Sequence, residues 1–210
     1  MSTELIVTFI AASSLISISP GPDNIFVLTQ SALYGRNSGL MVTLGLCTGL
    51  IIHTLAVALG VAALFQASSV AFAVLKIIGA AYLLYLAWQA FTASRSELSA
   101  STRSKVRSVK ELYMRGILMN VTNPKVSIFF LAFLPQFTAP ENGALVIQFF
   151  TLGAIFIAVA FLIFSAIAFL SGSIGYWFTN SLRGQIYLNR VAGLVFFGLA
   201  LKLVATSSNA

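Results

Sequence analysis

Two oppositely charged residues follow helix breakers inside long apolar runs, and together they could bind a zwitterion. Asp23 follows Ser19-Pro20-Gly21-Pro22, and Lys125 follows Thr122-Asn123-Pro124. Proline lacks an N–H donor and clashes with the preceding helical turn, while an ionisable group in hydrocarbon costs several kcal/mol. Neither is expected in a helix that only faces lipid. Their coincidence at two places indicates a polar path through the protein.

The helix breaks, formed by Pro20, Gly21, Pro22 and Pro124, expose backbone groups that need partners. Proline suits the first turn of a helix and glycine adopts geometries closed to other residues, so a half-helix is predicted to begin near Asp23. At membrane depth, broken backbone is tolerated only where it is buried in protein or lines a cavity. An amino acid would supply both partners: its carboxylate suits Lys125 or a half-helix N-terminus, and its ammonium suits Asp23 or free carbonyls.

The candidate residues for substrate binding or coupling are polar and close to the breaks in sequence, except for one histidine. They are Asp23, Asn24, His53, Asn120, Asn123 and Lys125. The alternative is a buried Asp23–Lys125 ion pair that only fixes packing, although such a pair often stabilises no better than apolar residues. The additional polar neighbours favour a hydrated site. They are Ser19, Thr122 and Ser127.

Three further patterns have both a structural and a functional interpretation. His53 is the only histidine, and it suits either a proton relay or substrate contact, or a neutral hydrogen bond between helices. Gly45 and Gly49 form a G-x-x-x-G pattern that predicts a close helix contact. Three aromatic residues lie on one face of a later segment, where ordinary packing is the simpler interpretation and a cavity lining the other. They are Tyr82, Tyr85 and Trp88.

The composition indicates an integral membrane protein with a single membrane domain covering residues 1–210. Apolar residues make up 59% of the chain and charged residues 8%, whereas soluble proteins have about 25% charged residues. The net charge of +7 does not indicate nucleic-acid binding, because the basic residues sit in loops rather than on one face. Six of them lie between Arg95 and Arg115, which is typical of a cytoplasmic loop.

Six segments are long and apolar enough to span a bilayer, which takes roughly 20 residues each. The predicted spans are Leu5 to Tyr34, Leu40 to Phe65, Val70 to Phe91, Leu112 to Leu134, Ala144 to Leu170 and Ile186 to Val204. The first and fourth contain the breaks. Loops after the odd-numbered spans are basic, so they are predicted to be cytoplasmic, including residues 94–111, and both termini to be periplasmic.

The two halves resemble each other, which predicts an inverted 3+3 repeat of residues 1–93 and 112–210. Pro22-Asp23 aligns with Pro124-Lys125, and Thr43-Leu44-Gly45 echoes Thr151-Leu152-Gly153. In such folds the ligand site lies at the repeat interface. Asp23 and Lys125 each lie about 16 Å from a helix end, near the midplane of a ~30 Å hydrocarbon core. The two charges are therefore expected to face each other.

The residue inventory argues against an enzyme. One histidine, one cysteine and a single intramembrane carboxylate cannot assemble a zinc cluster or a paired-carboxylate site, so no metal or cofactor is predicted. No Gly-x-x-x-x-Gly-Lys sequence appears, which argues against ATP-driven pumping by this chain alone. Ion gradients are the remaining energy source for transport.

The same motifs resemble the LysE/RhtB family of amino-acid exporters over nearly the full length. They are Ser19-Pro20-Gly21-Pro22, Gly45-Leu46-Cys47-Thr48-Gly49, Gly79-Ala80-Ala81-Tyr82-Leu83, Asn120-Val121-Thr122-Asn123-Pro124-Lys125 and Phe133-Leu134-Pro135-Gln136-Phe137. The resemblance implies a bacterial inner-membrane exporter of small neutral amino acids, driven by proton motive force in antiport. It is closest to the homoserine, homoserine lactone and threonine branch, and it makes a homodimer an open alternative.

Three rival interpretations remain at this point. The exporter could instead carry leucine-type or basic amino acids. The same polar breaks could line the continuous pore of a channel. The chain could also be a membrane scaffold in which the two charges are purely structural.

Overall fold

The computed structural model describes residues 1–61, 69–92, 108–138, 141, 143–171 and 182–205, and their regular structure is entirely helical. In the first half, a bent pair precedes two long helices. The elements are α1 (Thr3–Ile18), α2 (Pro22–Tyr34), α3 (Arg36–Ala56), its π-helical continuation η1 (Val57–Val61) and α5 (Ser69–Thr92). The bend between α1 and α2 is 59°, at the predicted first break.

The second half repeats this order. The elements are α6 (Val109–Val121), α7 (Pro124–Ile128), the π-helical η2 (Phe129–Phe133), the 3-10 turn η3 (Leu134–Phe137), α8 (Leu145–Phe169) and α10 (Leu182–Ala205). The bend between α6 and the segment Pro124–Phe137 is 49°, at the predicted second break. Both predicted breaks are therefore confirmed.

The helix α6 begins at Val109, within the last residues of the basic loop predicted at about 94–111. The reason is a capping box: the Ser108 hydroxyl accepts from the Glu111 N–H at 3.2 Å, and a Glu111 carboxylate oxygen accepts from the Ser108 N–H at 3.2 Å. Residues 94–107 of the predicted loop lie outside the described residues.

Length and apolar composition qualify two described segments as membrane spans, Arg36–Gly60 and Leu145–Phe169, and the number rises to four if each bent pair is one span. Large apolar side chains also lie on the outer surface: Leu59 and Leu162 are 66% and 67% exposed. Such a surface suits lipid rather than water. Six spans, and their arrangement as an inverted repeat, stay predictions.

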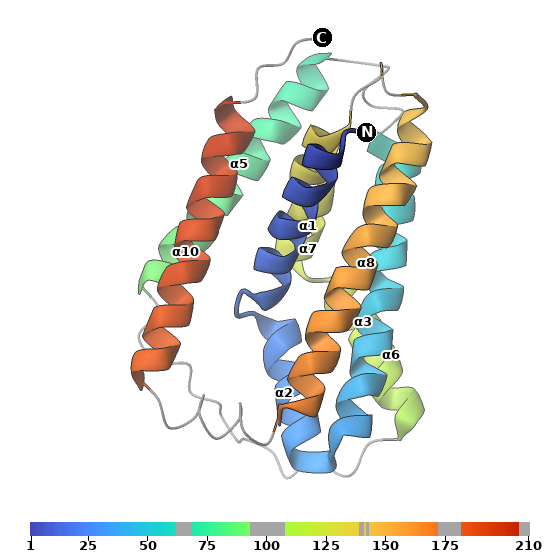
Figure 1. The fold of residues 1–210 in the computed structure, drawn as a ribbon, viewed down its shortest axis with the longest axis vertical. Coiled ribbons are helices and arrows are strands. Elements are labelled where there is room, and N and C mark those ends of the chain that lie inside the picture. Colours follow the sequence, from blue (N-terminus) through green and yellow to red (C-terminus); the bar gives the residue numbers. More distant parts are fainter. Residues whose placement is uncertain (62–68, 93–107, 139–140, 142, 172–181, 206–210) are drawn as a thin grey trace.

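The helix ends fall into two groups. Figure 1 shows that α1 begins and α10 ends at the same end of the molecule, whereas α2 ends, α3 and α6 begin and α8 ends at the opposite one. The described chain therefore has its first and last helical residues on one side. Which side of a membrane this is stays a prediction.

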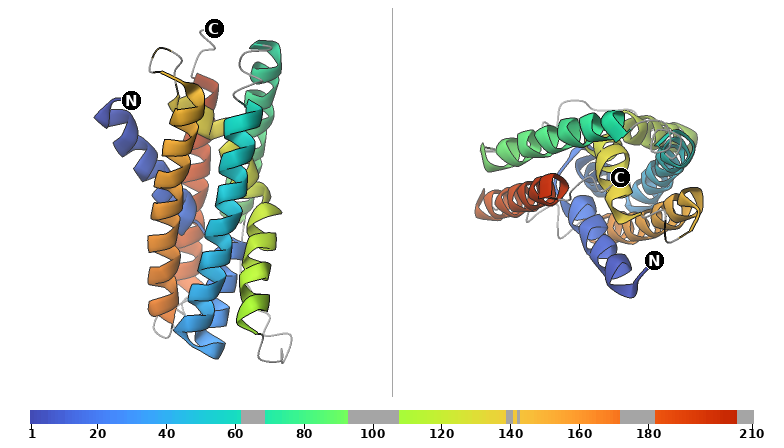
Figure 2. Two further views of the ribbon diagram at one scale, coloured as in Figure 1. Left: turned by 90° about the vertical axis from the view of Figure 1, so that its right-hand side faces the viewer. Right: turned by 90° about the horizontal axis from the view of Figure 1, so that it is seen from above.

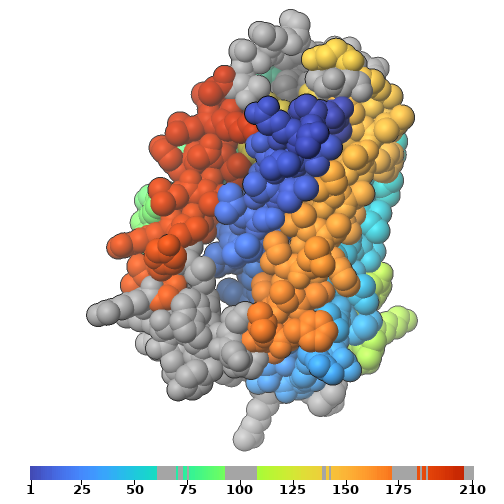
Figure 3. All heavy atoms as spheres, in the orientation of Figure 1, coloured from blue at the N-terminus to red at the C-terminus, as the bar shows by residue number. Residues whose placement is uncertain are grey.

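The helices form two unequal groups. Seen from above in Figure 2, α5 and α10 lie together on one side of the molecule, apart from α3, α6 and α8. The closest packing is between α3 and α6, followed by that between α5 and α10. The α5–α10 pair contacts the other helices mainly through η2, α1 and α7. Figure 3 shows α1 lying between α10 and α8 on one face.

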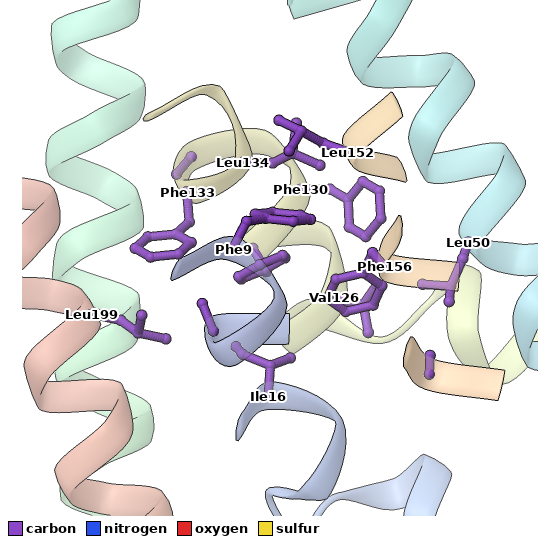
Figure 4. Close-up of a cluster of buried hydrophobic side chains, with 14 of the residues drawn as sticks. Phe9, Ile16, Leu50, Val126, Phe130, Phe133, Leu134, Leu152, Phe156 and Leu199 are labelled. Carbon is purple, nitrogen blue, oxygen red and sulfur yellow. The ribbon is translucent and has the colours of Figure 1, made fainter. Parts of the chain in front are cut away.

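An aromatic cluster surrounds η2, where the two groups meet (Figure 4). Phe129 and Phe130 are fully buried, and both lie 5.1 Å from Phe156 of α8 between ring centroids. The Phe133 ring lies 5.2 Å from that of Phe129. Aromatic rings at these separations attract one another beyond the area that they bury. The cluster holds the second broken helix against α1 and α8.

Glycines allow α3 and α6 to pack with their backbones in contact. A Cβ added at Gly45 would overlap the Tyr113 carbonyl oxygen, and one added at Gly116 would lie 2.5 Å from the Val42 carbonyl oxygen. A Cβ at Gly49 would lie 2.7 Å from the side-chain oxygen of Asn120. The close contact predicted from Gly45 and Gly49 is confirmed, and its partner is the helix that carries Asn120.

Replacing Gly45 should destabilise the protein, because the clashing atoms belong to backbone and cannot rotate away. Gly45→Ala is expected to lower the free energy of unfolding by about 1–3 kcal/mol, which thermal unfolding in detergent would detect. The matched control is Gly198→Ala, because nothing lies within 4 Å of a Cβ there. Equal melting temperatures for the two variants would contradict the close packing.

Candidate functional site

The first break is held together by Lys125. A helical N–H donates to the carbonyl four residues earlier, so Pro20, which has no N–H, leaves the Ile16 carbonyl without its helical partner. The Lys125 ammonium takes that place: Nζ donates to the Ile16 oxygen at 3.3 Å and to the Ser19 oxygen at 3.0 Å. Lys125 lies in the first turn of the second half-helix α7, and its side chain caps the end of α1. The residue is 8% exposed.

Asn24 completes the same end of α1. Its side-chain Nδ2 donates to the Ser17 carbonyl oxygen at 2.7 Å. Three carbonyls from the last turn of α1 therefore receive side-chain donors, one from α2 and two from Lys125. This is the cavity-lining or protein-buried environment that broken backbone requires within a membrane.

The second break shows a related arrangement with different residues. Pro124 cannot donate to the Asn120 carbonyl, and His53 Nε2 lies 3.2 Å from that oxygen. The His53 ring also packs on Phe130, with 5.6 Å between centroids. Of the two interpretations of His53, the geometry matches the hydrogen bond between helices. Asn123 caps α7, because its side-chain oxygen accepts from the Lys125 N–H at 3.0 Å.

Asp23 is 2% exposed and lies in the first turn of α2, where the helix dipole favours a negative charge. One carboxylate oxygen accepts from Asn120 Nδ2 at 3.2 Å. The other has no hydrogen-bond partner among the described residues. Asp23 and Lys125 are close enough to interact electrostatically, but within the described chain no direct ion pair joins them. Each charge has partners of its own.

Several buried polar atoms near the breaks have no partner within the described part of the chain. They are Ser17 Oγ, Ser19 Oγ, Asp23 Oδ1, Asn24 Oδ1, Asn120 Oδ1 and Asn123 Nδ2. Leaving such an atom unpaired costs about 1–3 kcal/mol, so buried polar groups nearly always have partners. The cluster can therefore accept a polar ligand. Thr122 and Ser127 do not add to it, because their hydroxyls bond their own helix backbone.

Gly21 is required for a reason other than the predicted one. Its φ of −171° is extended backbone that any residue adopts, so conformational freedom is not the cause. Instead, a Cβ at this position would lie 2.9 Å from Lys125 Nζ. The missing side chain lets the ammonium reach the carbonyls of α1.

A cavity of about 480 Å³ lies between the breaks and the α5–α10 pair. The breaks contribute Pro20, Gly21, Pro22, Asn123, Pro124 and Lys125. One face each of α5 and α10 contributes Tyr82, Leu86, Gln89, Asn189, Ala192 and Phe196. Four predicted site residues, Asp23, Asn24, His53 and Asn120, do not line this cavity.

A cavity lining was one of two interpretations of the aromatic face of α5, whereas the wall formed by α10 was not predicted. Of the three aromatics, Tyr82 lines the cavity, whereas Tyr85 and Trp88 are 47% and 62% exposed on the outside. Asn189 and Phe196 were not singled out. The signal for them was an amide in an apolar segment, with residues three and seven positions later on the same helical face.

Comparisons with known proteins give the family of the chain and several relatives. The LysE type translocator family matches residues 14–207. A homoserine/homoserine lactone efflux protein of Salmonella typhi is 34% identical over 93% of this chain and 94% of its own length. A leucine efflux protein of Salmonella choleraesuis is 28% identical over 96% and 95%.

An uncharacterized membrane protein of Vibrio cholerae is 30% identical over 99% of both chains. No solved structure matches. Within the described residues, no group of three or more His, Cys, Asp or Glu side chains could hold a metal ion. The relatives with functional names are efflux proteins rather than enzymes. With its family match across almost the whole length, its two broken helices and its membrane-type surface, this multi-pass membrane protein belongs to the LysE type translocator family.

Proposed function

We propose that this protein is a secondary active exporter of small neutral amino acids or their close derivatives, coupled to proton motive force in the bacterial inner membrane. The observation that carries the proposal is Lys125, a buried ammonium that lines the cavity and donates to the backbone carbonyls of Ile16 and Ser19. Relatives named for the efflux of homoserine, homoserine lactone and leucine support amino acids as the substrate class.

The substrate's two charged groups would compete with contacts that already exist. Its carboxylate binds Lys125 and the free amide of Asn123, both of which line the cavity. Its ammonium then takes the carbonyls of Ile16 and Ser19 in place of Lys125. Each charged group of the zwitterion and of the site then keeps a partner. This matters because a buried charge without a partner is costly in a low-dielectric interior.

We propose that the moving parts of the transporter are the two packing groups of helices rather than the two halves of the sequence. The sequence suggests that two half-repeats rock around the site, but α5 and α10 pack on each other and only lightly on the remaining helices. The cavity lies along this boundary. Rotation of the α5–α10 pair against the other helices would open the cavity to either side in turn.

The inverted repeat and its orientation belong to the same proposal. Helices at equivalent positions in the two halves pack on each other, α3 on α8 and α5 on α10. The first helix of each half packs on the second helix of the other half, α1 on α8 and α6 on α3. Two halves related by a two-fold axis in the membrane plane would pack in this way. Loop 94–111 is then cytoplasmic and both termini periplasmic. A homodimer stays an alternative.

Removing either charge should abolish efflux. In proteoliposomes, Asp23→Asn and Lys125→Met are expected to slow counterflow of labelled homoserine or threonine at least tenfold. The cause is that Lys125→Met removes the ammonium proposed to bind the substrate carboxylate. Asp23→Asn removes the carboxylate proposed to take part in proton coupling. The exposed residues Glu4 and Lys110 provide the controls Glu4→Gln and Lys110→Met. Normal counterflow by correctly inserted site variants would refute the assigned roles, and conductance without counterflow would indicate a channel.

Gly21→Ala tests the position of the Lys125 ammonium without changing a charge. The added methyl should displace Nζ from the α1 carbonyls and reduce transport about tenfold or more. The fold should survive, because the clashing atom ends a flexible side chain. Gly198→Ala, which adds the same group in open space, should transport normally. If the two variants transported equally well, close approach at Gly21 would not matter for function.

Proton coupling predicts that substrate efflux moves protons in the opposite direction. A pH-sensitive dye inside proteoliposomes should report a proton flux that requires substrate and disappears in Asp23→Asn. The reason is that one carboxylate oxygen of Asp23 has no hydrogen-bond partner in the described part of the chain and is free to take up a proton. Substrate flux at saturation without any proton movement would show a uniporter instead.

A further inference from the structure

We infer that Asn189 of α10 recognises the substrate's side chain. It favours a side chain with a hydroxyl group over a hydrocarbon side chain of the same shape. The inference rests on the proposed function, because it assigns the second wall of the same cavity. Lys125 and Asn123 bind the carboxylate, which all amino acids share. Asn189 contacts the side chain, which differs among them.

The position of Asn189 supports this division. Its side chain is 9% exposed and lines the cavity together with Lys125 and Asn123. No hydrogen bond joins its amide to another described residue. Its neighbours along the same face of α10, Ala192 and Phe196, are apolar and also line the cavity. Asn189 is therefore a buried amide that lines the cavity beside two apolar residues of the same helix.

Size cannot provide the selectivity. A cavity of about 480 Å³ is large for a small amino acid, since pockets of roughly 300–1,000 Å³ hold much larger ligands. A missing methylene in an apolar pocket changes discrimination only about 10- to 200-fold even when the fit is close. A polar group that must be hydrogen-bonded discriminates more strongly, because the wrong ligand leaves it buried and unpaired.

The Asn189 amide can both accept a hydrogen bond from a hydroxyl and donate one to it. Its oxygen accepts from the hydroxyl hydrogen, and its NH₂ donates to the hydroxyl oxygen. A methyl group in the same place satisfies neither. Tyr82 of α5 lines the same cavity and offers a second hydroxyl partner. A leucine side chain at position 189 would keep the volume and remove both hydrogen-bonding groups.

The two recognition functions lie on different structural groups. Lys125 and Asn123 belong to the second break, whereas Asn189 belongs to the α5–α10 pair. A substrate that bonds both groups bridges the boundary along which the proposed motion occurs. Changes at Asn189 should therefore alter the choice among amino acids while the binding of the shared carboxylate persists.

The test compares isosteric pairs in proteoliposomes, homoserine with norvaline and threonine with valine. In each pair a methyl replaces the hydroxyl. The wild-type protein should transport the hydroxylated member at least tenfold better. Asn189→Leu should reduce that ratio at least tenfold, and Asn189→Ser, which keeps a polar group, should retain a preference for the hydroxyl. Phe197→Leu, an exposed position on α10, is the control and should leave the ratio unchanged.

Competition in the wild-type protein gives a second readout that needs no variant. Excess unlabelled norvaline should inhibit homoserine counterflow at least tenfold less than excess unlabelled homoserine. Equal inhibition, or an unchanged ratio in Asn189→Leu, would overturn the role of Asn189 while efflux itself stands. Absence of counterflow for every amino acid tested would overturn the proposed function and this inference together.

Discussion

The unpaired backbone carbonyl is the constraint on which the rest of this structure depends. Pro20 has no N–H for Ile16, and at membrane depth a carbonyl without its helical partner needs another donor. The donor comes from the other half of the chain, as the Lys125 ammonium. One contact therefore closes the end of α1, fixes the start of α7 and places a positive charge beside a cavity. The arrangement of the surrounding helices follows from bringing these two breaks together.

Close backbone packing makes that meeting possible. Gly45 and Gly116 bring α3 against α6, which carries Asn120 to the carboxylate of Asp23 and its carbonyl to His53. On the other side, the rings around η2 fix the second broken helix against α8. The helices of the first group are thus packed closely where the breaks meet. Among the described residues, the α5–α10 pair packs less extensively on the other helices, and the cavity lies between this pair and the breaks.

Sequence reasoning finds what local chemistry determines and misses what distant packing determines. Prolines and glycines locate both breaks, and apolar lengths locate the helices, because these effects act within a few residues. The partner of Lys125 could not be deduced, since carbonyls carry no sequence signal of their own. Gly21 was explained by conformation, although the structure gives close approach as the cause. Asn189 gains meaning only from the cavity beside it.

The contact between the Lys125 ammonium and the α1 carbonyls also affects how much net charge moves with the substrate. In many broken-helix transporters, unwound carbonyls bind a sodium ion that enters with the substrate. Here the cation at such carbonyls is covalently attached, so it never leaves and needs no supply from outside. With Asp23 nearby, the site contains one acidic and one basic side chain, and a zwitterion adds no net charge. Substrate passage through this site would then be electroneutral, and the membrane voltage would act only through whatever ion is exchanged for it.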